Sequence, residues 1–176
     1  MLNDFVVKHD IRSVIEFGCG DGHQLSLSRY PQYIGIDVSP TAVKRCQYLF
    51  QEDKFKRFLV SDRNCANSER ADLALSLDVI FHLVEDDIYE RYMRSLFAAA
   101  NRFVIIYSDN EESPREALHV RHRRFTDWIG CNKLDWQLVE HIPNQFPSQS
   151  NQELGSWADF WVYVRAGRDH RSMERQ

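Results

Sequence analysis

The stretch that decides the fold is EFGCGDG, residues 16–22, in which three glycines alternate with other residues. It follows a strand-like run at residues 13–17 and precedes a segment with helical character. Glycine lets the backbone turn sharply and lets a ligand approach without an intervening Cβ. In a parallel sheet, the carboxyl end of the first strand is where nucleotide-like ligands bind. The stretch therefore predicts a ligand-binding turn, with a purely structural turn as the alternative interpretation.

The rest of the chain alternates between strand-like and helix-like segments, which is typical of a parallel sheet with helices on its faces. The expected strands cover residues 13–17, 33–37, 58–61, 73–77, 103–107, 136–141 and 159–164. Ser39 and Pro40 indicate a helix start, because serine caps helices and proline suits the first turn. A second helix is expected from Asp86 and a short one near residues 126–131. The sequence thus predicts one α/β domain over residues 1–166 and a polar tail at 167–176.

Three acidic residues occur one after another at the ends of expected strands. Asp37 ends the second strand, Asp62 follows the third and Asp78 follows the fourth. A carboxylate at Asp37 can accept both ribose hydroxyls, and one at Asp62 can accept from an adenine amino group. Each alone is as well explained as a surface acid or a helix cap. The whole series is harder to obtain by chance, and the G-x-G-x-G spacing disfavours NAD and FAD, whose fingerprint is G-x-G-x-x-G.

With these residues, the chain resembles the class I S-adenosylmethionine-dependent methyltransferases. The resemblance lies in VIEFGCGDG (14–22), YIGIDVS (33–39), FLVSD (58–62) and ADLALSLDVIFHL (71–83), and it covers residues 13–107 well. It implies a Rossmann-like, doubly wound, three-layer α/β fold. The sheet would have seven mostly parallel strands, with the last one antiparallel. It also implies S-adenosylmethionine as the methyl donor and S-adenosylhomocysteine as the product.

The resemblance further implies which residues contact the donor. Asp37 takes the ribose-binding place, Asp62 the adenine-contacting place, and Asp78 lies beside the methyl end. Glu16 would support the methionine amino group, directly or through water. The full expected set is Glu16, Gly18, Cys19, Gly20, Gly22, Asp37, Val38, Asp62, Ser76, Leu77 and Asp78.

Candidates for the acceptor side gather in residues 115–124, where six of the ten positions are arginine or histidine. Arginine offers a planar fork that suits carboxylates and phosphates, which favours an anionic acceptor. The expected acceptor-binding set is Arg115, His119, Arg121 and Arg124. His119 or His122 is a candidate general base, because imidazole titrates near neutrality, and His82 is another. The alternatives are a solvated charged segment and, for His82, a core histidine.

The acceptor pocket itself is less well defined by the sequence. Many enzymes of this family carry helices before the first motif that cover the acceptor, whereas here about a dozen residues precede the first strand. The pocket must then be built by residues 108–127 and 143–156, by a second copy or partner subunit, or hardly at all. Trp157 is the aromatic residue considered for its wall, although core packing is the default role for such residues.

The composition of the chain disfavours several classes of function. The chain has 176 residues, a formal net charge of −4 and a pI near 6.0, which does not favour binding to nucleic acid. No apolar run reaches the ~20 residues of a membrane span, and the N-terminus lacks a signal-peptide core. The cysteines, Cys19, Cys46, Cys65 and Cys131, form no C-x-x-C pair and match no zinc pattern. We therefore expect reduced thiols, no metal and a cytoplasmic location.

Three functions follow as hypotheses. The first is an O- or N-methyltransferase acting on a small polar, and in its narrower form anionic, molecule. The alternative is a non-catalytic module that binds S-adenosylmethionine or S-adenosylhomocysteine and regulates a partner protein. The third is an oxidoreductase of related fold, against which the glycine spacing argues.

Overall fold

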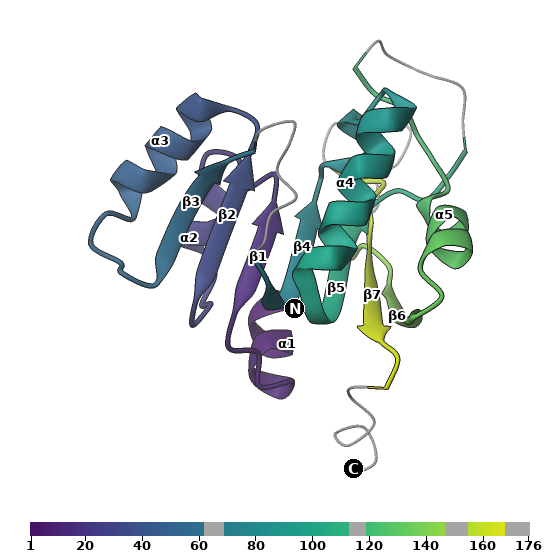
Figure 1. Ribbon diagram of the computed structural model, residues 1–176, viewed down its shortest axis with the longest axis horizontal. Coiled ribbons are helices and arrows are strands. Elements are labelled where there is room, and N and C mark those ends of the chain that lie inside the picture. Colours follow the sequence, from purple (N-terminus) through teal and green to yellow (C-terminus); the bar gives the residue numbers. More distant parts are fainter. Residues whose placement is uncertain (62–68, 113–118, 147–154, 168–176) are drawn as a thin grey trace.

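The computed structural model describes residues 1–61, 69–112, 119–146 and 155–167. They build one seven-stranded sheet in the order β3-β2-β1-β4-β5-β7-β6 (Figure 1). The strands are β1 Val14–Phe17, β2 Tyr33–Asp37, β3 Lys56–Val60, β4 Ala71–Leu77, β5 Ala100–Ser108, β6 Trp136–Ile142 and β7 Asp159–Arg165. Only β7 runs antiparallel to its neighbours, β5 and β6, while the other pairs are parallel. The predicted Rossmann-like topology is confirmed.

The helices are α1 Leu2–Lys8, α2 His23–Ser26, α3 Pro40–Leu49, the 3-10 helix η1 Ile80–His82, α4 Asp86–Ala99 and α5 Phe125–Asn132. Helices α3 and α4 begin where their start signals predict. Ser39 caps α3, because its hydroxyl accepts from the N–H of Ala42 at 3.3 Å. Helix α1 was not expected from the sequence. Its charges mask a short apolar stripe, of which Phe5 and Val6 are buried.

Alternate residues of each strand pack on opposite faces of the sheet, which gives the predicted three layers. In β5, Val104 and Ile106 join the cluster with α4 and α5, whereas Phe103 and Ile105 join the cluster with α1, α2 and α3. Figure 1 shows α4 lying over the middle of the sheet with α5 to one side.

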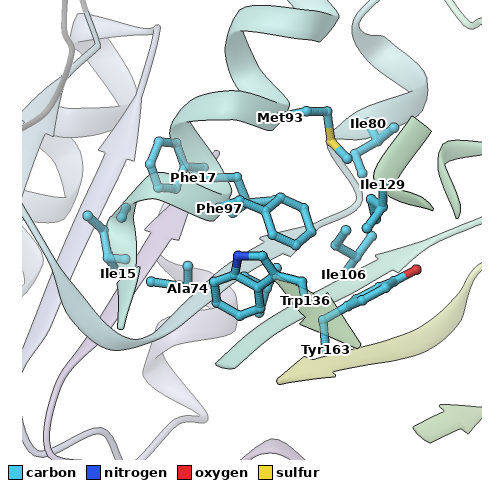
Figure 2. Packing of buried hydrophobic residues seen from close by; sticks show 14 of the residues in the cluster. Ile15, Phe17, Ala74, Ile80, Met93, Phe97, Ile106, Ile129, Trp136 and Tyr163 are labelled. Carbon is cyan, nitrogen blue, oxygen red and sulfur yellow. The ribbon is translucent and has the colours of Figure 1, made fainter. Parts of the chain in front are cut away.

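The cluster under α4 extends across the sheet to its far edge (Figure 2). Phe97 of α4 packs edge-on against Trp136 of β6 and Tyr163 of β7, with ring centres 5.2 and 5.9 Å apart. These contacts hold the last two strands to the helix layer, so the carboxyl edge of β5 keeps a fixed position beside them.

Several expectations concern features beyond the sheet. In the ranges described, no helix is both long and apolar enough to cross a membrane. Within the same ranges, no three His, Cys, Asp or Glu side chains gather closely enough to hold a metal ion. Cys19, Cys46 and Cys131 are free thiols. Cys65 and the expected tail from residue 168 onward lie outside the described residues.

Candidate active site

The glycine turn leaves the end of β1 and is fastened to β2 by backbone hydrogen bonds. The N–H groups of Gly18 and Cys19 both donate to the carbonyl of Ile36, over 2.7 and 3.1 Å. Gly18 has a φ of +84°, and a Cβ added there would overlap Cγ2 of Val79. Gly20 has a φ of +57°, and apart from its chain neighbours no described atom lies within 4 Å of an added Cβ. Sterics therefore require glycine at position 18, whereas Gly20 borders open space that a ligand can enter.

Asp37 holds the glycine turn from the end of β2. Its Oδ2 accepts from the N–H of Gly20 at 2.9 Å, and its Oδ1 accepts from the N–H of Ser39 at 2.8 Å. A carboxylate has about four lone-pair sites, so two backbone donors leave capacity for a diol. Val38, the next residue, is 79% exposed and adds an apolar surface at this edge. The acid expected to bind ribose thus lies directly against the turn expected to bind the donor.

Glu16 lies beneath the turn and is only 4% exposed. The hydroxyl of Tyr33 donates to its Oε2 at 2.7 Å. Burial raises the pKa of Glu16 to about 7, and the hydrogen bond from Tyr33 lowers it only in part. Burial also raises the pKa of the neighbouring Cys19 thiol, which favours packing over reactivity. Gly22, with a φ of +83°, ends the turn as the N-cap of α2.

The end of β4 adjoins the turn and is tied to it by α4. Ser76 is fully buried, and Leu77 is the last residue of the strand. The hydroxyl of Tyr92 lies 2.7 Å from Ser76 Oγ and 3.2 Å from the carbonyl oxygen of Phe17. One tyrosine of α4 therefore joins the carboxyl ends of β1 and β4.

Asp78 begins the loop from β4 to η1 with a φ of +57°. Its N–H donates to the carbonyl of Tyr107 in β5 over 3.0 Å. Desolvation raises the pKa of the Asp78 carboxyl, while the nearby His82 lowers it. His82 Nδ1 lies 3.3 Å from the carbonyl oxygen of His119, and the two rings are 6.4 Å apart. Two of the three histidines expected as bases, His82 and His119, are thus exposed neighbours at the same edge.

Residues 119–124 lie against the loop that follows β4. The N–H of Arg121 donates to the carbonyl of Phe81 over 2.8 Å. Its guanidinium donates to the carbonyl of Val84 at 3.0 Å and lies 2.9 Å from the carboxylate of Asp86. Much of the charge of Arg121 is therefore balanced by Asp86 at the protein surface.

Arg123 and Arg124 differ in how far they are open to a ligand. The guanidinium of Arg123 lies 3.0 Å from Asp86 and 4.6 Å from the ring centre of Tyr89. Its side chain is 11% exposed, compared with 55% for Arg124. Arg123 therefore braces the start of α4. Arg124 lies 3.9 Å from the exposed carboxylate of Asp127 and remains open enough to solvent to meet an anion. Arg115 lies outside the described residues.

An acid and a histidine form a buried pair just beyond β5. Oδ2 of Asp109 lies 2.7 Å from Nδ1 of His122, and each side chain is 9% exposed. The ring of Trp157 lies 6.4 Å from that of His122. His122 also lines a cavity of about 590 Å³ between the start of α4, residues 121–124 and α5. The pair thus connects the edge of the sheet with a space large enough for a small molecule.

A family profile described as a methyltransferase domain matches residues 8–159. The chain belongs to this methyltransferase family. It is an S-adenosylmethionine-dependent methyltransferase of class EC 2.1.1.-, as the sequence predicts. Among curated proteins, none matches the chain in sequence.

Solved structures share the fold of this methyltransferase. The methyltransferase domain of bacterial CtHen1-C aligns with a TM-score of 0.69 and 21% identity, over 93% of this chain and 94% of that one. N-methyltransferase NodS from Bradyrhizobium japonicum, in complex with S-adenosylhomocysteine, gives 0.71 and 14%, over 89% and 79%. Magnesium protoporphyrin IX methyltransferase from Synechocystis, with the same bound product, gives 0.68 and 16%, over 94% and 80%. At these identities the likeness shows the fold alone.

The structure brings the expected donor residues of this methyltransferase to the ends of β1, β2 and β4, apart from Asp62, which lies outside the described residues. Asp109, and the contacts by which Tyr92 joins the carboxyl ends of β1 and β4, were not predicted from the sequence. Asp109 follows its strand as Asp78 follows its own, so the same strand-end pattern would have found it. For Tyr92, helical spacing predicted only that the side chain is buried.

Proposed function

We propose that this methyltransferase methylates an oxygen or nitrogen atom of a small polar acceptor at the carboxyl edge of its sheet. The hydrogen bond between Asp37 and Gly20 carries the proposal, because it puts an acceptor of ribose hydroxyls beside a turn that leaves room for a ligand. S-adenosylmethionine supplies a methyl group already activated by a sulfonium, so the protein mainly has to align the acceptor atom. The proposed donor residues are Glu16, Gly18, Cys19, Gly20, Gly22, Asp37, Val38, Asp62, Ser76, Leu77 and Asp78.

The narrower form of the proposal is an anionic acceptor held by Arg115, His119, Arg121 and Arg124. The exposure of Arg124, and the N–H groups of Arg121 that remain beyond its bonds to Val84 and Asp86, support it. His82 and His119 are proposed bases because His82 lies near Asp78 and His119 lies beside His82.

The experiment that tests the donor site is calorimetric titration with S-adenosylmethionine and S-adenosylhomocysteine. We expect micromolar dissociation constants, and an affinity about 100-fold lower in Asp37→Ala, because two charge-assisted hydrogen bonds are lost. The matched control is Asp87→Ala, which removes an exposed acid paired with Arg91 on the same helix. Equal binding by wild type and Asp37→Ala would contradict the proposed donor site.

The acceptor is tested by measuring S-adenosylhomocysteine release with matched pairs of small acids and their neutral amides. We expect turnover with the acids, and a KM about 10-fold higher in Arg124→Ala, since a charge-assisted contact is lost. Preference for the amides would contradict an anionic acceptor. Donor binding without turnover on any acceptor favours the non-catalytic module. Lack of nucleic-acid binding, a second copy or partner subunit completing the pocket, and a cytoplasmic location remain predictions from the sequence.

A further inference from the structure

The buried pair of Asp109 and His122 has the geometry of an oriented base. Oδ2 of Asp109 is 2.7 Å from His122 Nδ1, and the hydroxyl of Ser108 donates to the other carboxylate oxygen at 3.4 Å. A carboxylate that accepts from Nδ1–H leaves the lone pair of the neutral ring on Nε2. In the ranges described, no residue hydrogen-bonds to that Nε2. The free nitrogen is therefore available to take a proton from a bound molecule.

Backbone contacts put this pair beside the loop that follows β4. Asp78 donates its N–H to Tyr107, two residues before Asp109, at 3.0 Å. Arg121, the residue before His122, donates its N–H to a carbonyl of η1 at 2.8 Å. The pair therefore lies at the edge where Asp78 marks the proposed methyl end of the donor, and His122 lines the cavity described above.

The other two histidines that the sequence offers as bases lack this support. His82 and His119 are both exposed, and Nδ1 of His82 meets a backbone carbonyl rather than a carboxylate. Neither forms an ion pair with any residue that the structure describes. A carboxylate both fixes an imidazole in place and stabilises the imidazolium that proton uptake creates. His122 is thus better prepared for proton transfer than either of them.

We propose that His122, oriented by Asp109, is the general base that takes the proton of the acceptor. This role of His122 rests on the proposed function, in which the methyl group is transferred to an O–H or N–H group of the acceptor. A lone pair of the acceptor atom forms the new bond to the methyl carbon, and the C–S bond breaks with its electron pair going to sulfur. The proton of the acceptor passes to Nε2 of His122, and the imidazolium later returns it to water. Asp109 is a positioning residue in this step.

The test is NMR of the protein carrying ¹⁵N-labelled histidine, at about pH 8, where imidazole is mostly neutral. Ring ¹⁵N shifts show which nitrogen carries the hydrogen, and we expect the Nδ1–H form at His122. S-adenosylmethionine and S-adenosylhomocysteine differ by the methyl group and its positive charge. We therefore expect His122 to show the largest shift difference between the two complexes among the seven histidines. His122→Gln assigns the signal.

Asp109→Ala tests the positioning role. We expect the His122 signal to move toward the Nε2–H form, while Asp127→Ala, which removes an exposed acid on α5, leaves it unchanged. Retention of the Nδ1–H form in Asp109→Ala would overturn the role of Asp109. Should that variant not fold, the wild-type spectra still decide the proposal.

The remaining outcomes separate this inference from the proposed function. Binding of both ligands with a larger shift difference at His82 or His119 overturns the assignment of His122 and leaves the methyl transfer standing. An Nε2–H form of His122 in the wild type also overturns it. Failure of both ligands to bind the folded protein overturns the donor site, and the inference falls with it.

Discussion

The two sides of the carboxyl edge are held by different kinds of contact. On the donor side, the glycine turn and Asp37 are joined by backbone N–H groups within 17 residues of each other. On the acceptor side, Arg121 and Arg123 reach carbonyls 37 to 40 residues away in the chain. The donor side is thus built from strand ends and their next residues, whereas the acceptor side depends on how distant segments pack.

This difference also shows in the charges. Among the residues that the structure describes, Asp37 meets only backbone donors and keeps acceptor capacity for a ligand. Asp86, by contrast, faces both Arg121 and Arg123, which lower its pKa. A charge that bonds only to backbone groups can still attract a charged or polar ligand, whereas charges paired with each other partly cancel and attract a ligand less strongly. The following substitutions test that contrast.

The largest effect is expected in the glycine turn. Gly18→Ala should lower the free energy of unfolding by roughly 3–4 kcal/mol, because the residue has a positive φ and the new Cβ overlaps Val79. Gly20→Ala should cost only about 1 kcal/mol, since its Cβ meets open space, yet it should weaken donor binding at least about 10-fold. Urea unfolding and calorimetry measure the two quantities. If Gly20→Ala binds the donor normally, the turn is structural only.

The buried acid under the turn should make stability depend on pH. With a folded pKa of about 7 and an ordinary value of 4.5, Glu16 is protonated in both states at low pH. As pH rises from about 4.5 to 7, only the unfolded state loses this proton readily, so stability falls by about 3 kcal/mol. Glu16→Gln should remove that decrease, whereas the exposed Glu90→Gln should keep it. Parallel stability curves for wild type and Glu16→Gln between pH 4 and 8 would contradict this account.

The same difference between the donor side and the acceptor side explains which parts of the site could be predicted from the sequence. The glycine turn, Asp37 and Asp78 were predictable because each follows a strand, and strand ends of a parallel sheet share one edge. The helix starts at Pro40 and Asp86 were predictable from local signals. The pairing of Asp109 with His122 was not, because it depends on where residues 119–124 cross η1. The contacts of Arg121 with Asp86 and Val84 could not be predicted for the same reason.

A smaller effect is expected from the two neighbouring arginines. Arg123→Ala should lower the free energy of unfolding by about 2 kcal/mol. It removes the donor to the half-buried carbonyl of Leu83, one of two donors to that of Val84, and the cation over Tyr89. Arg124→Ala should change it by less than about 0.5 kcal/mol, since its side chain is 55% exposed. Thermal unfolding of the two variants measures both changes in stability. Equal losses of stability would show that Arg124 is also structural, which would weaken its proposed role in binding an anion.

The smallest effects are expected at the starts of helices α3 and α4. Ser39→Ala should cost about 1 kcal/mol, because the hydroxyl caps Ala42 in α3. Donor binding should persist, since the N–H that Ser39 gives to Asp37 belongs to the backbone. Glu85 occupies the matching position of α4 but makes no side-chain cap, so Glu85→Ala should change stability by less than about 0.5 kcal/mol. Chemical unfolding of both variants measures this. A cost at Glu85 equal to that at Ser39 would mean that α4 is started locally, and that the distant arginines are not what holds it.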